Sequence, residues 1–243
     1  MLHRFFVEPD QVTDGTIIIN GDDVKHISKV LRLHENDNIT VCDCDGFDYT
    51  CKIQSILSDE VVAAIIEKTP SGAEPPVNVT IYQGMPKSDK MDYIVQKCVE
   101  LGAVAVVPVI TKRTIAIPKD ETKKIARWQK IAAEAAKQSG RGIIPDVESV
   151  VSFKDMIENL SPDDLNILPY ESEKDLSLKN ILDNTDRKNI NIIIGPEGGF
   201  DESEVLLAKE KNINIVTLGP RILRTETAPL AALAAVMYQL GDW

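Results

Sequence analysis

The chain has 243 residues, of which 43% are hydrophobic, and its formal net charge is −11. This hydrophobic content excludes a disordered chain, and the acidic total argues against an indiscriminate nucleic-acid binder. The longest apolar stretch, residues 228–237, is too short to span a bilayer, and no signal peptide is evident. We therefore expect a cytoplasmic protein without a membrane partner, whose four poorly spaced cysteines are buried structural thiols rather than zinc ligands.

The first seventy residues have the pattern of a small β-barrel. Apolar runs separated by Asp, Gly and Asn turns predict strands at residues 4–7, 16–20, 38–42, 47–56 and 60–68. Residues 69–76 have the Pro, Gly and Ser content of a linker. We therefore place one domain at residues 1–72 and a second at residues 73–243.

A short helix is predicted within the first domain, beginning at Asp22 or Asp23. Its apolar side chains are expected on one buried face: Val24, Ile27, Val30 and Leu31. Its other side presents basic side chains: Lys25, His26, Lys29 and Arg32. These are either ordinary surface residues or an edge that touches RNA.

From residue 77 the pattern alternates between strands and helices. Strands are predicted at residues 77–82, 104–110, 165–168, 190–194 and 213–218. Helices are predicted at residues 87–101, 120–140 and 177–183, and two further helices follow the last two strands. Residues 146–150 and 153–159 form additional elements of this region. This alternation is typical of an α/β fold with a mostly parallel sheet covered on both faces.

Two loops near the end of the chain are the strongest candidates for a site. Residues 195–200 (GPEGGF) and 218–227 (LGPRILRTET) each follow a buried strand and lead into a helix. Asp201 and Glu204 are predicted to cap the N-terminus of the helix after the first loop. Thr227 is predicted to cap the helix after the second loop. Both loops should therefore lie at the carboxyl edge of the sheet, where α/β proteins bind ligands.

The spacing of these glycines excludes two common nucleotide sites. GPEGG matches neither the dinucleotide-binding fingerprint nor the P-loop, and no acidic residue stands at the ribose position. A bare tight turn is the alternative for the first loop. The second loop argues for more than a turn, because charges so close to an apolar helix require a partner or a ligand nearby.

Basic residues are concentrated in one segment of the acidic chain. Residues 110–142 contain nine basic and three acidic side chains, whereas residues 1–74 contain six basic and 14 acidic ones. This stripe is either a solvated helix face or a surface that meets a phosphate backbone.

Several motifs, in order along nearly the whole chain, resemble one family. They are the two loops, residues 87–92 (KSDKMD), 96–102 (QKCVELG), 127–128 (RW), 134–141 (EAAKQSGR), 3–7 (HRFFV) and 26–32 (HISKVLR). The family is that of the bacterial 16S ribosomal RNA uridine-N3 methyltransferases, small-subunit methyltransferase E, in the SPOUT superfamily. The resemblance implies a PUA-like barrel, a C-terminal domain with a deep trefoil knot, and a homodimer. It also implies S-adenosyl-L-methionine as cofactor, no metal, and 16S ribosomal RNA of the small subunit as substrate.

The resemblance also implies roles for particular residues. The expected cofactor-binding residues are Leu168, Tyr170, Gly195, Pro196, Glu197, Gly198, Gly199, Leu218, Gly219, Ile222, Leu223, Thr225 and Ala228. Arg224, Arg141 and Gln138 are expected to hold the uracil carbonyls or flanking phosphates, with Glu226 as the base or a base-orienting group. The expected RNA-binding residues are Arg4, His26, Lys29, Arg32, Arg113, Lys123, Lys124 and Arg127.

Three alternatives remain open at this level. Glu226 is either catalytic or a structural partner of Arg221 or Arg224. Gly198 is expected to need a positive φ or a close approach by the ligand. The whole protein is alternatively a non-catalytic RNA-binding factor of the same fold, or a methyltransferase of the ribose 2′-hydroxyl.

Overall fold

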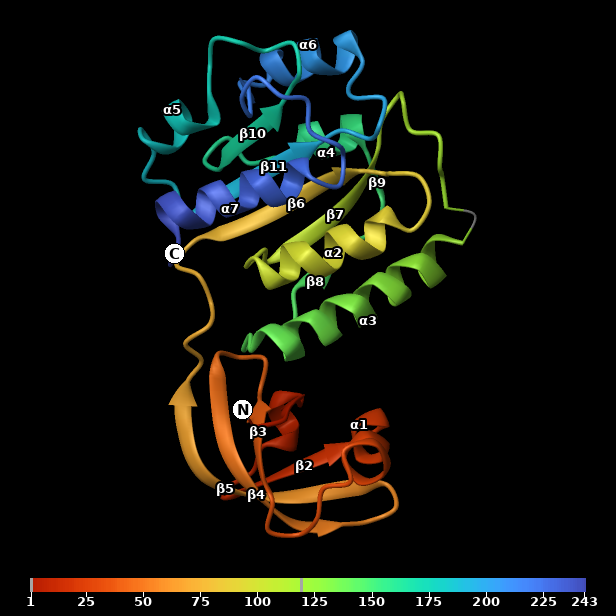
Figure 1. Ribbon diagram of the computed structural model, residues 1–243, viewed down its shortest axis with the longest axis vertical. Coiled ribbons are helices and arrows are strands. Elements are labelled where there is room, and N and C mark those ends of the chain that lie inside the picture. The colour runs from red at the N-terminus through yellow and green to blue at the C-terminus, as the bar shows by residue number, and fades with distance from the viewer. Residues whose placement is uncertain (1, 119) are drawn as a thin grey trace. The chain divides into compact units, whose positions relative to one another are not determined.

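The computed structural model describes residues 2–118 and 120–243, in two compact units. The first comprises the chain up to Glu74 together with Ala136–Ile144, and the second comprises Pro75–Ala135 together with Pro145–Trp243. Figure 1 shows the helices and strands of the two units, and each unit has its own hydrophobic core. The division into domains at residues 1–72 and 73–243 stays a prediction.

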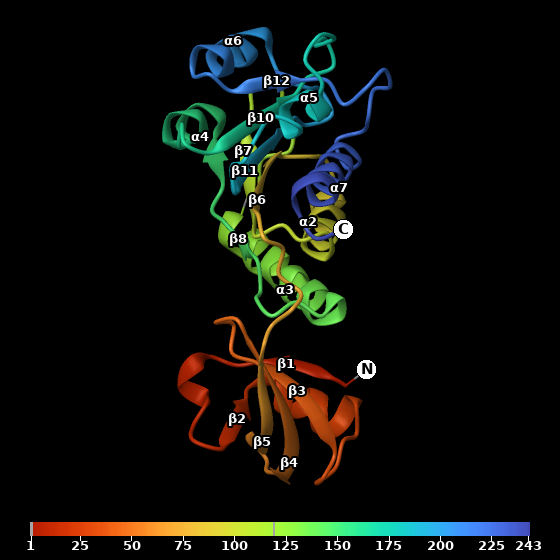
Figure 2. The ribbon, with the colours of Figure 1, turned by 90° about the vertical axis from the view of Figure 1, so that its left-hand side faces the viewer.

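The first unit is built on a five-stranded sheet in the order β1-β3-β4-β5-β2. Its strands are β1 (Arg4–Phe6), β2 (Thr16–Asn20), β3 (Asn38–Cys42), β4 (Phe47–Ile56) and β5 (Glu60–Pro70). β1 pairs with β3 in parallel, and the other pairs are antiparallel. Two irregularities in the register of β4 and β5 bend these long strands, so the sheet curls (Figure 2). The predicted linker begins too early, because Thr69 and Pro70 belong to β5.

The helix predicted in the first unit is less regular than its sequence pattern indicates. α1 (Asp22–Lys25) continues into a π-turn at His26–Val30, in which the Leu31 amide donates to the carbonyl oxygen of His26 over 2.9 Å. A π-turn has more residues per turn than an α-helix and so rotates the side chains that follow. Val30 is therefore 66% exposed, and its predicted place on the buried face is wrong.

The second unit contains a parallel sheet in the order β12-β10-β11-β6-β7-β8, and β9 also pairs with β7. The strands are β6 (Asn78–Gly84), β7 (Ala105–Ile110), β8 (Asp146–Val147), β9 (Val151–Ser152), β10 (Leu165–Pro169), β11 (Asn189–Ile194) and β12 (Asn214–Val216). The predicted α/β fold with a parallel sheet is confirmed. One feature of the order is decisive for the site: β10 lies between β11 and β12.

Helices cover both faces of this sheet. They are α2 (Lys90–Glu100), α3 (Glu121–Ser139), α4 (Phe153–Asn159), α5 (Leu178–Leu182), α6 (Glu202–Glu210) and α7 (Ala228–Leu240). α7 packs against α2, β11 and β6, whereas α4 packs against α6 and β7. Figure 2 shows α2 and α7 on one side of the sheet and α4 on the other. Among the described residues, no helix is long and apolar enough to span a membrane.

The caps of the last two helices differ from each other. Asp201 and Glu204 form a complete capping box at α6, so the predicted cap is confirmed. Thr227 stands at the N-cap position of α7, but its side chain makes no capping hydrogen bond. α7 instead begins with Pro229 in its first turn, where a missing backbone N–H costs little.

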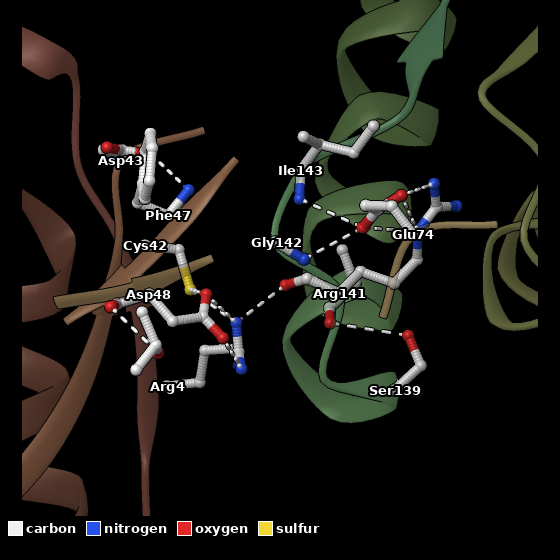
Figure 3. Close-up of polar contacts among 12 residues, drawn as sticks. Arg4, Cys42, Asp43, Phe47, Asp48, Glu74, Ser139, Arg141, Gly142 and Ile143 are labelled. Carbon is white, nitrogen blue, oxygen red and sulfur yellow. Dashed lines mark hydrogen bonds and ion pairs between the residues drawn. The ribbon is translucent and has the colours of Figure 1, made fainter. Parts of the chain in front are cut away.

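A network of buried and partly buried charges holds residues 136–144 in the first unit (Figure 3). Arg4 and Asp48 form an ion pair at 2.7 Å, and Arg4 also donates to the carbonyl oxygen of Arg141 at 3.0 Å. The guanidinium of Arg141, a residue only 2% exposed, donates to Glu74 Oε2 at 2.6 Å. The other oxygen of Glu74 accepts from the Gly142 amide at 2.9 Å. Buried charges require such partners, so the network is part of the core structure.

This network bears on the predicted RNA contact of Arg4, which stays a prediction. Arg4 is engaged by Asp48 and by the backbone of Arg141, and its side chain is only 16% exposed. It therefore holds β1 against β4 and does not offer an open cation to a phosphate.

The buried pair between Glu74 and Arg141 gives a stability prediction. Glu74→Ala removes the carboxylate that accepts from Arg141 and Gly142. Because loss of one partner of a buried pair is strongly destabilising, we expect a loss of about 2–4 kcal/mol in the first unit. Hydrogen exchange of the amides in β3, β4 and β5 measures this loss. Glu67→Ala, at an exposed position of β5, is the control, and equal protection in both variants would contradict the prediction.

Candidate functional site

A cavity of about 980 Å³ opens at the carboxyl ends of β10, β11 and β12 in the second unit. Two segments line most of it: the loop of residues 195–200, termed the first loop, and residues 217–228, which contain the second loop. The end of β10 and the chain after it contribute further residues: Pro169, Tyr170, Glu171, Glu173 and Lys174. The cavity therefore lies where the sequence places the two loops, at the carboxyl edge of the sheet.

Close backbone packing shapes the first loop. The Gly199 amide donates to the carbonyl oxygen of Pro196 at 2.9 Å, and Gly199 has a φ of +66°. A Cβ at Gly195 would lie 3.3 Å from the backbone of Gly199. Gly198 has no positive φ, so of the two predicted reasons for this glycine the close approach by the ligand remains a prediction. A Cβ at Gly198 would instead crowd the Arg113 side chain at 3.2 Å.

The second loop is joined to the first by a buried hydrogen bond. Thr225 Oγ1 donates to the carbonyl oxygen of Gly195 at 2.7 Å and accepts from Gln83 Nε2 at 3.0 Å. Gln83 is fully buried and Thr225 is 6% exposed, so water does not compete strongly for these bonds. This chain of contacts ties both loops to the end of β6.

A single ammonium group contacts an acidic side chain from each loop. Lys90 Nζ lies 3.0 Å from Glu197 Oε1 and 3.0 Å from Glu226 Oε2. Arg224 lies 4.0 Å from the other oxygen of Glu226, and its side chain is 83% exposed. Lys90 is therefore the closer ionic partner of Glu226, and the expected pair with Arg224 is present at a longer distance.

The surrounding charges keep these three groups ionised. Burial on its own would raise the pKa of Glu226, but its own backbone amide and Lys90 outweigh that effect and lower the pKa below 4.5. Burial on its own would also raise the pKa of Glu197. Hydrogen bonds from Lys90 and from the backbone amides of Glu197 and Lys87 outweigh it and lower the pKa. Hydrogen bonds to Glu197 and Glu226 raise the pKa of Lys90. At neutral pH the cluster thus contains one cation and two anions.

The structure brings most of the predicted cofactor residues together. Twelve of them line the cavity: Tyr170, Gly195, Pro196, Glu197, Gly198, Gly199, Leu218, Gly219, Ile222, Leu223, Thr225 and Ala228. Leu168 is not among the lining residues, and its cofactor contact stays a prediction. It is fully buried in the core beside Ile193, Phe200 and Ile215, because it precedes the strand end.

The predicted catalytic residues fall into two groups. Arg224 lines the cavity, and Glu226 contacts the cavity-lining Lys90. Gln138 and Arg141 belong to the first unit, where Gln138 is exposed and Arg141 is bound to Glu74. The catalytic roles of Gln138 and Arg141 stay predictions.

Most of the predicted RNA-binding residues are accessible. His26, Lys29 and Arg32 are exposed on and after the π-turn of the first unit. In the second unit, Arg113 donates to the carbonyl oxygen of Gly198 at 2.9 Å, directly beside the cavity. Lys123 is exposed and Lys124 partly buried on α3.

One basic residue of α3 has a structural partner. Arg127 pairs with Asp92 of α2, and Asp92 also accepts from Trp128 Nε1 at 3.0 Å. The side chain of Arg127 is still 56% exposed. A substitution there would thus disturb helix packing as well as surface charge.

The sequence predictions missed several residues of the cavity. Lys90, Glu171, Glu173, Lys174 and Thr217 line it although no site role was expected for them. The signal for Lys90 was its place in the KSDKMD motif at the start of a helix. Among the described residues, no group of three or more His, Cys, Asp or Glu side chains is arranged to hold a metal ion.

The close approach of β6 to the first loop gives a prediction. A Cβ at Gly84 would lie 2.7 Å from the Pro196 nitrogen and 2.9 Å from the Ile194 carbonyl oxygen. Backbone atoms cannot turn aside, so Gly84→Ala should lower the free energy of unfolding by about 2 kcal/mol, as measured by urea denaturation. In Gly72→Ala, the control, the added methyl group meets no atom within 4 Å. Equal stability of the two variants would show that the loop can shift at no cost.

Two family models match the chain. One is described as an RNA methyltransferase domain and matches residues 73–237, and the other, an RNA methyltransferase PUA domain, matches residues 19–66. Ribosomal RNA small subunit methyltransferase E of Bacillus subtilis (strain 168) is 40% identical, covering 98% of this chain and 97% of that protein. The protein of the same name from Synechocystis sp. is 32% identical, covering 97% of this chain and 77% of that protein.

Solved structures agree with these matches. A ribosomal RNA small subunit methyltransferase E from Neisseria gonorrhoeae, bound to S-adenosyl methionine, has a TM-score of 0.90 at 34% identity over 100% of both chains. A putative methyltransferase from Legionella pneumophila, in complex with the same cofactor, has a TM-score of 0.88 at 26% identity over 100% of both chains. The resemblance seen in the motifs is confirmed: the chain belongs to the ribosomal RNA small subunit methyltransferase E family, with a PUA domain and an RNA methyltransferase domain.

Proposed function

We propose that this chain is an S-adenosylmethionine-dependent methyltransferase that methylates N3 of a specific uridine in 16S ribosomal RNA of the small subunit. The observation that carries the proposal is the glycine-lined cavity at the carboxyl edge of the parallel sheet. The family membership supports it, as do the relatives whose structures contain S-adenosyl methionine.

The residues of the cavity fit this cofactor. At about 980 Å³ its volume lies within the range of small-molecule sites. Gly195, Gly198, Gly199 and Gly219 expose backbone groups to it without a Cβ, and Tyr170 and Ile222 supply apolar surface. These residues would hold the adenosine and methionine parts, and the bound cofactor would supply a methyl group on a sulfonium sulfur.

The protein itself must manage a proton at the acceptor. N3 of uridine carries a weakly acidic proton, which has to leave as the methyl group arrives, so a general base assists. We propose that Glu226 is the base that removes this proton or the group that orients that base. Its lowered pKa keeps the carboxylate ionised at neutral pH. Arg224, which lines the cavity, would hold a uracil carbonyl or a flanking phosphate, while the roles expected of Arg141 and Gln138 stay predictions.

The substrate base must leave its pairing partner before reaction. N3 is engaged in the Watson–Crick pair, so the target uridine is unpaired or extruded. Basic residues would bind the surrounding backbone: Arg113 beside the cavity, His26, Lys29 and Arg32 in the PUA domain, and Lys123, Lys124 and Arg127 on α3. A groove lined partly by Lys123, Arg127 and Lys130 offers room for a phosphate backbone between α2 and α3.

Two further features belong to the proposal. The path of the chain supports a trefoil knot: it leaves the edge strand β12, binds the first loop through Thr225, and returns as α7 to the middle of the sheet.

A homodimer is proposed from the family resemblance and from the small side chains of α7, which allow close helix packing.

One experiment tests the function directly. Small subunits that lack the modification are incubated with the protein and S-adenosylmethionine carrying a labelled methyl group, and the digested RNA is separated by chromatography. We expect label in N3-methyluridine. Label in a 2′-O-methylated nucleoside would assign the ribose activity, whereas cofactor binding without any transfer would indicate a non-catalytic factor.

Glu226→Gln tests the proposed base. The substitution keeps the size and removes the charge, so turnover at saturating cofactor should fall by about 10²–10⁴-fold with little change in thermal stability. Raising the pH should restore part of the turnover, because more of the uracil is then deprotonated. Glu202→Gln, at an exposed position of α6, is the control. Normal turnover in Glu226→Gln, or a joint loss of cofactor affinity and thermal stability, would remove Glu226 from the chemistry.

Charge reversal on α3 tests the RNA contact. Lys123→Glu combined with Lys124→Glu should weaken RNA binding and lower the slope of log K against log salt by about 1–2, since each neutralised phosphate releases counterions. Arg127 is left intact because it pairs with Asp92. Reversal of the exposed Lys188 and Lys211 is the control. An unchanged slope would identify the stripe as an ordinary solvated face.

A further inference from the structure

Lys90 occupies a distinctive place between three segments of the second unit. It is the first residue of α2 and lines the cavity. Its ammonium lies 3.0 Å from Glu197 of the first loop and 3.0 Å from Glu226 of the second loop. One side chain therefore connects α2, the first loop and the second loop through two ion pairs.

The first loop is well anchored without Lys90. The Lys87 amide donates to both oxygens of Glu197, at 3.1 and 3.3 Å, and Pro196 packs directly against Gly84. Arg113 also donates to the carbonyl oxygen of Gly198 at 2.9 Å. Loss of the ammonium would leave these contacts in place.

The second loop has fewer anchors. Thr225 donates to Gly195 of the first loop and accepts from Gln83 of β6, while Gly219 donates to Thr217, which directly precedes the second loop. The exposed Pro220, Arg221 and Ile222 lie between these two points. The pair between Lys90 and Glu226 is the charged link of this loop to α2.

We propose that Lys90 is a positioning residue that holds the second loop against the first and so sets the geometry of the cavity for the cofactor. The effect on cofactor binding rests on the proposed function, whereas the restraint of the second loop by Lys90 does not depend on it. The raised pKa of Lys90 keeps it charged at neutral pH, as an ionic link requires.

The expected effect is local because the pairs are partly exposed. The side chains of Lys90, Glu197 and Glu226 are 32%, 29% and 20% exposed. Solvent screens such pairs, so they contribute little to global stability. They still restrict a loop that has few other contacts, and without the ammonium the two carboxylates repel each other.

Hydrogen exchange of the full-length, cofactor-free protein tests the structural part. Lys90→Met keeps the length of the side chain and removes its charge. We expect amides of residues 218–226 to exchange about three- to tenfold faster, while those of residues 195–200 change little. Lys90→Arg should restore slow exchange, since a guanidinium can donate to both carboxylates.

Lys97→Met is the matched control for loss of charge. Lys97 lies on the same helix and pairs with Glu100 at 2.8 Å, with side-chain exposures of 33% and 27% that are close to those of the Lys90 cluster. It contacts neither loop among the interactions of the described residues. Its substitution should leave exchange in residues 218–226 unchanged.

Calorimetry with S-adenosylmethionine tests the consequence. We expect its dissociation constant to rise about three- to tenfold in Lys90→Met and to recover in Lys90→Arg, with the melting temperature nearly constant. Unchanged exchange in residues 218–226 of Lys90→Met, or an equal increase throughout the second unit, would overturn the positioning role. Absence of binding by the unaltered protein would instead refute the proposed cofactor, and the exchange result would still decide the role of Lys90.

Discussion

The position of β10 between β11 and β12 is the constraint on which the cavity depends. Neighbouring strands of a sheet lie about 4.8 Å apart, so the two loops begin roughly 10 Å apart at the sheet edge. The end of β10 lies between them and supplies Tyr170 and the residues after it. This separation leaves room for a ligand, and the loops approach each other at Thr225 and Gly195.

Two kinds of contact hold the loops together, and they differ in environment. The hydrogen bonds of Gln83, Thr225 and Gly195 are buried, so they fix the inner part of the site. The ion pairs of Lys90 are partly exposed and act on the outer part. A site with a rigid base and a more weakly held rim suits a ligand that must enter and leave, because regions of low local stability are those that open.

Charged residues in the motifs serve structure as well as function. Arg141 belongs to a motif of the family, yet its guanidinium is engaged by Glu74, which lies 67 positions earlier in the chain. Arg4 is engaged in the same way by Asp48, 44 positions later. A basic side chain read from the sequence is thus available to a ligand only if the fold has not already given it an acidic partner.

The sequence by itself determined the elements and the place of the cavity. The bounds of β2, β3, β4 and α4 agree with the predicted ranges, because alternation and helical periodicity depend on neighbours along the chain. The glycines of both loops marked the cavity for a similar reason, since they follow buried strands of one sheet. Most of the cofactor residues could therefore be named before the fold was known.

Only the tertiary structure decided the partners and the final orientation of side chains. It paired Glu226 with Lys90 rather than Arg221, and placed Leu168 in the core. It also exposed Val30 through a π-turn that helical periodicity did not indicate. These outcomes depend on strand order and on contacts between distant segments, and local periodicity carries no information about either.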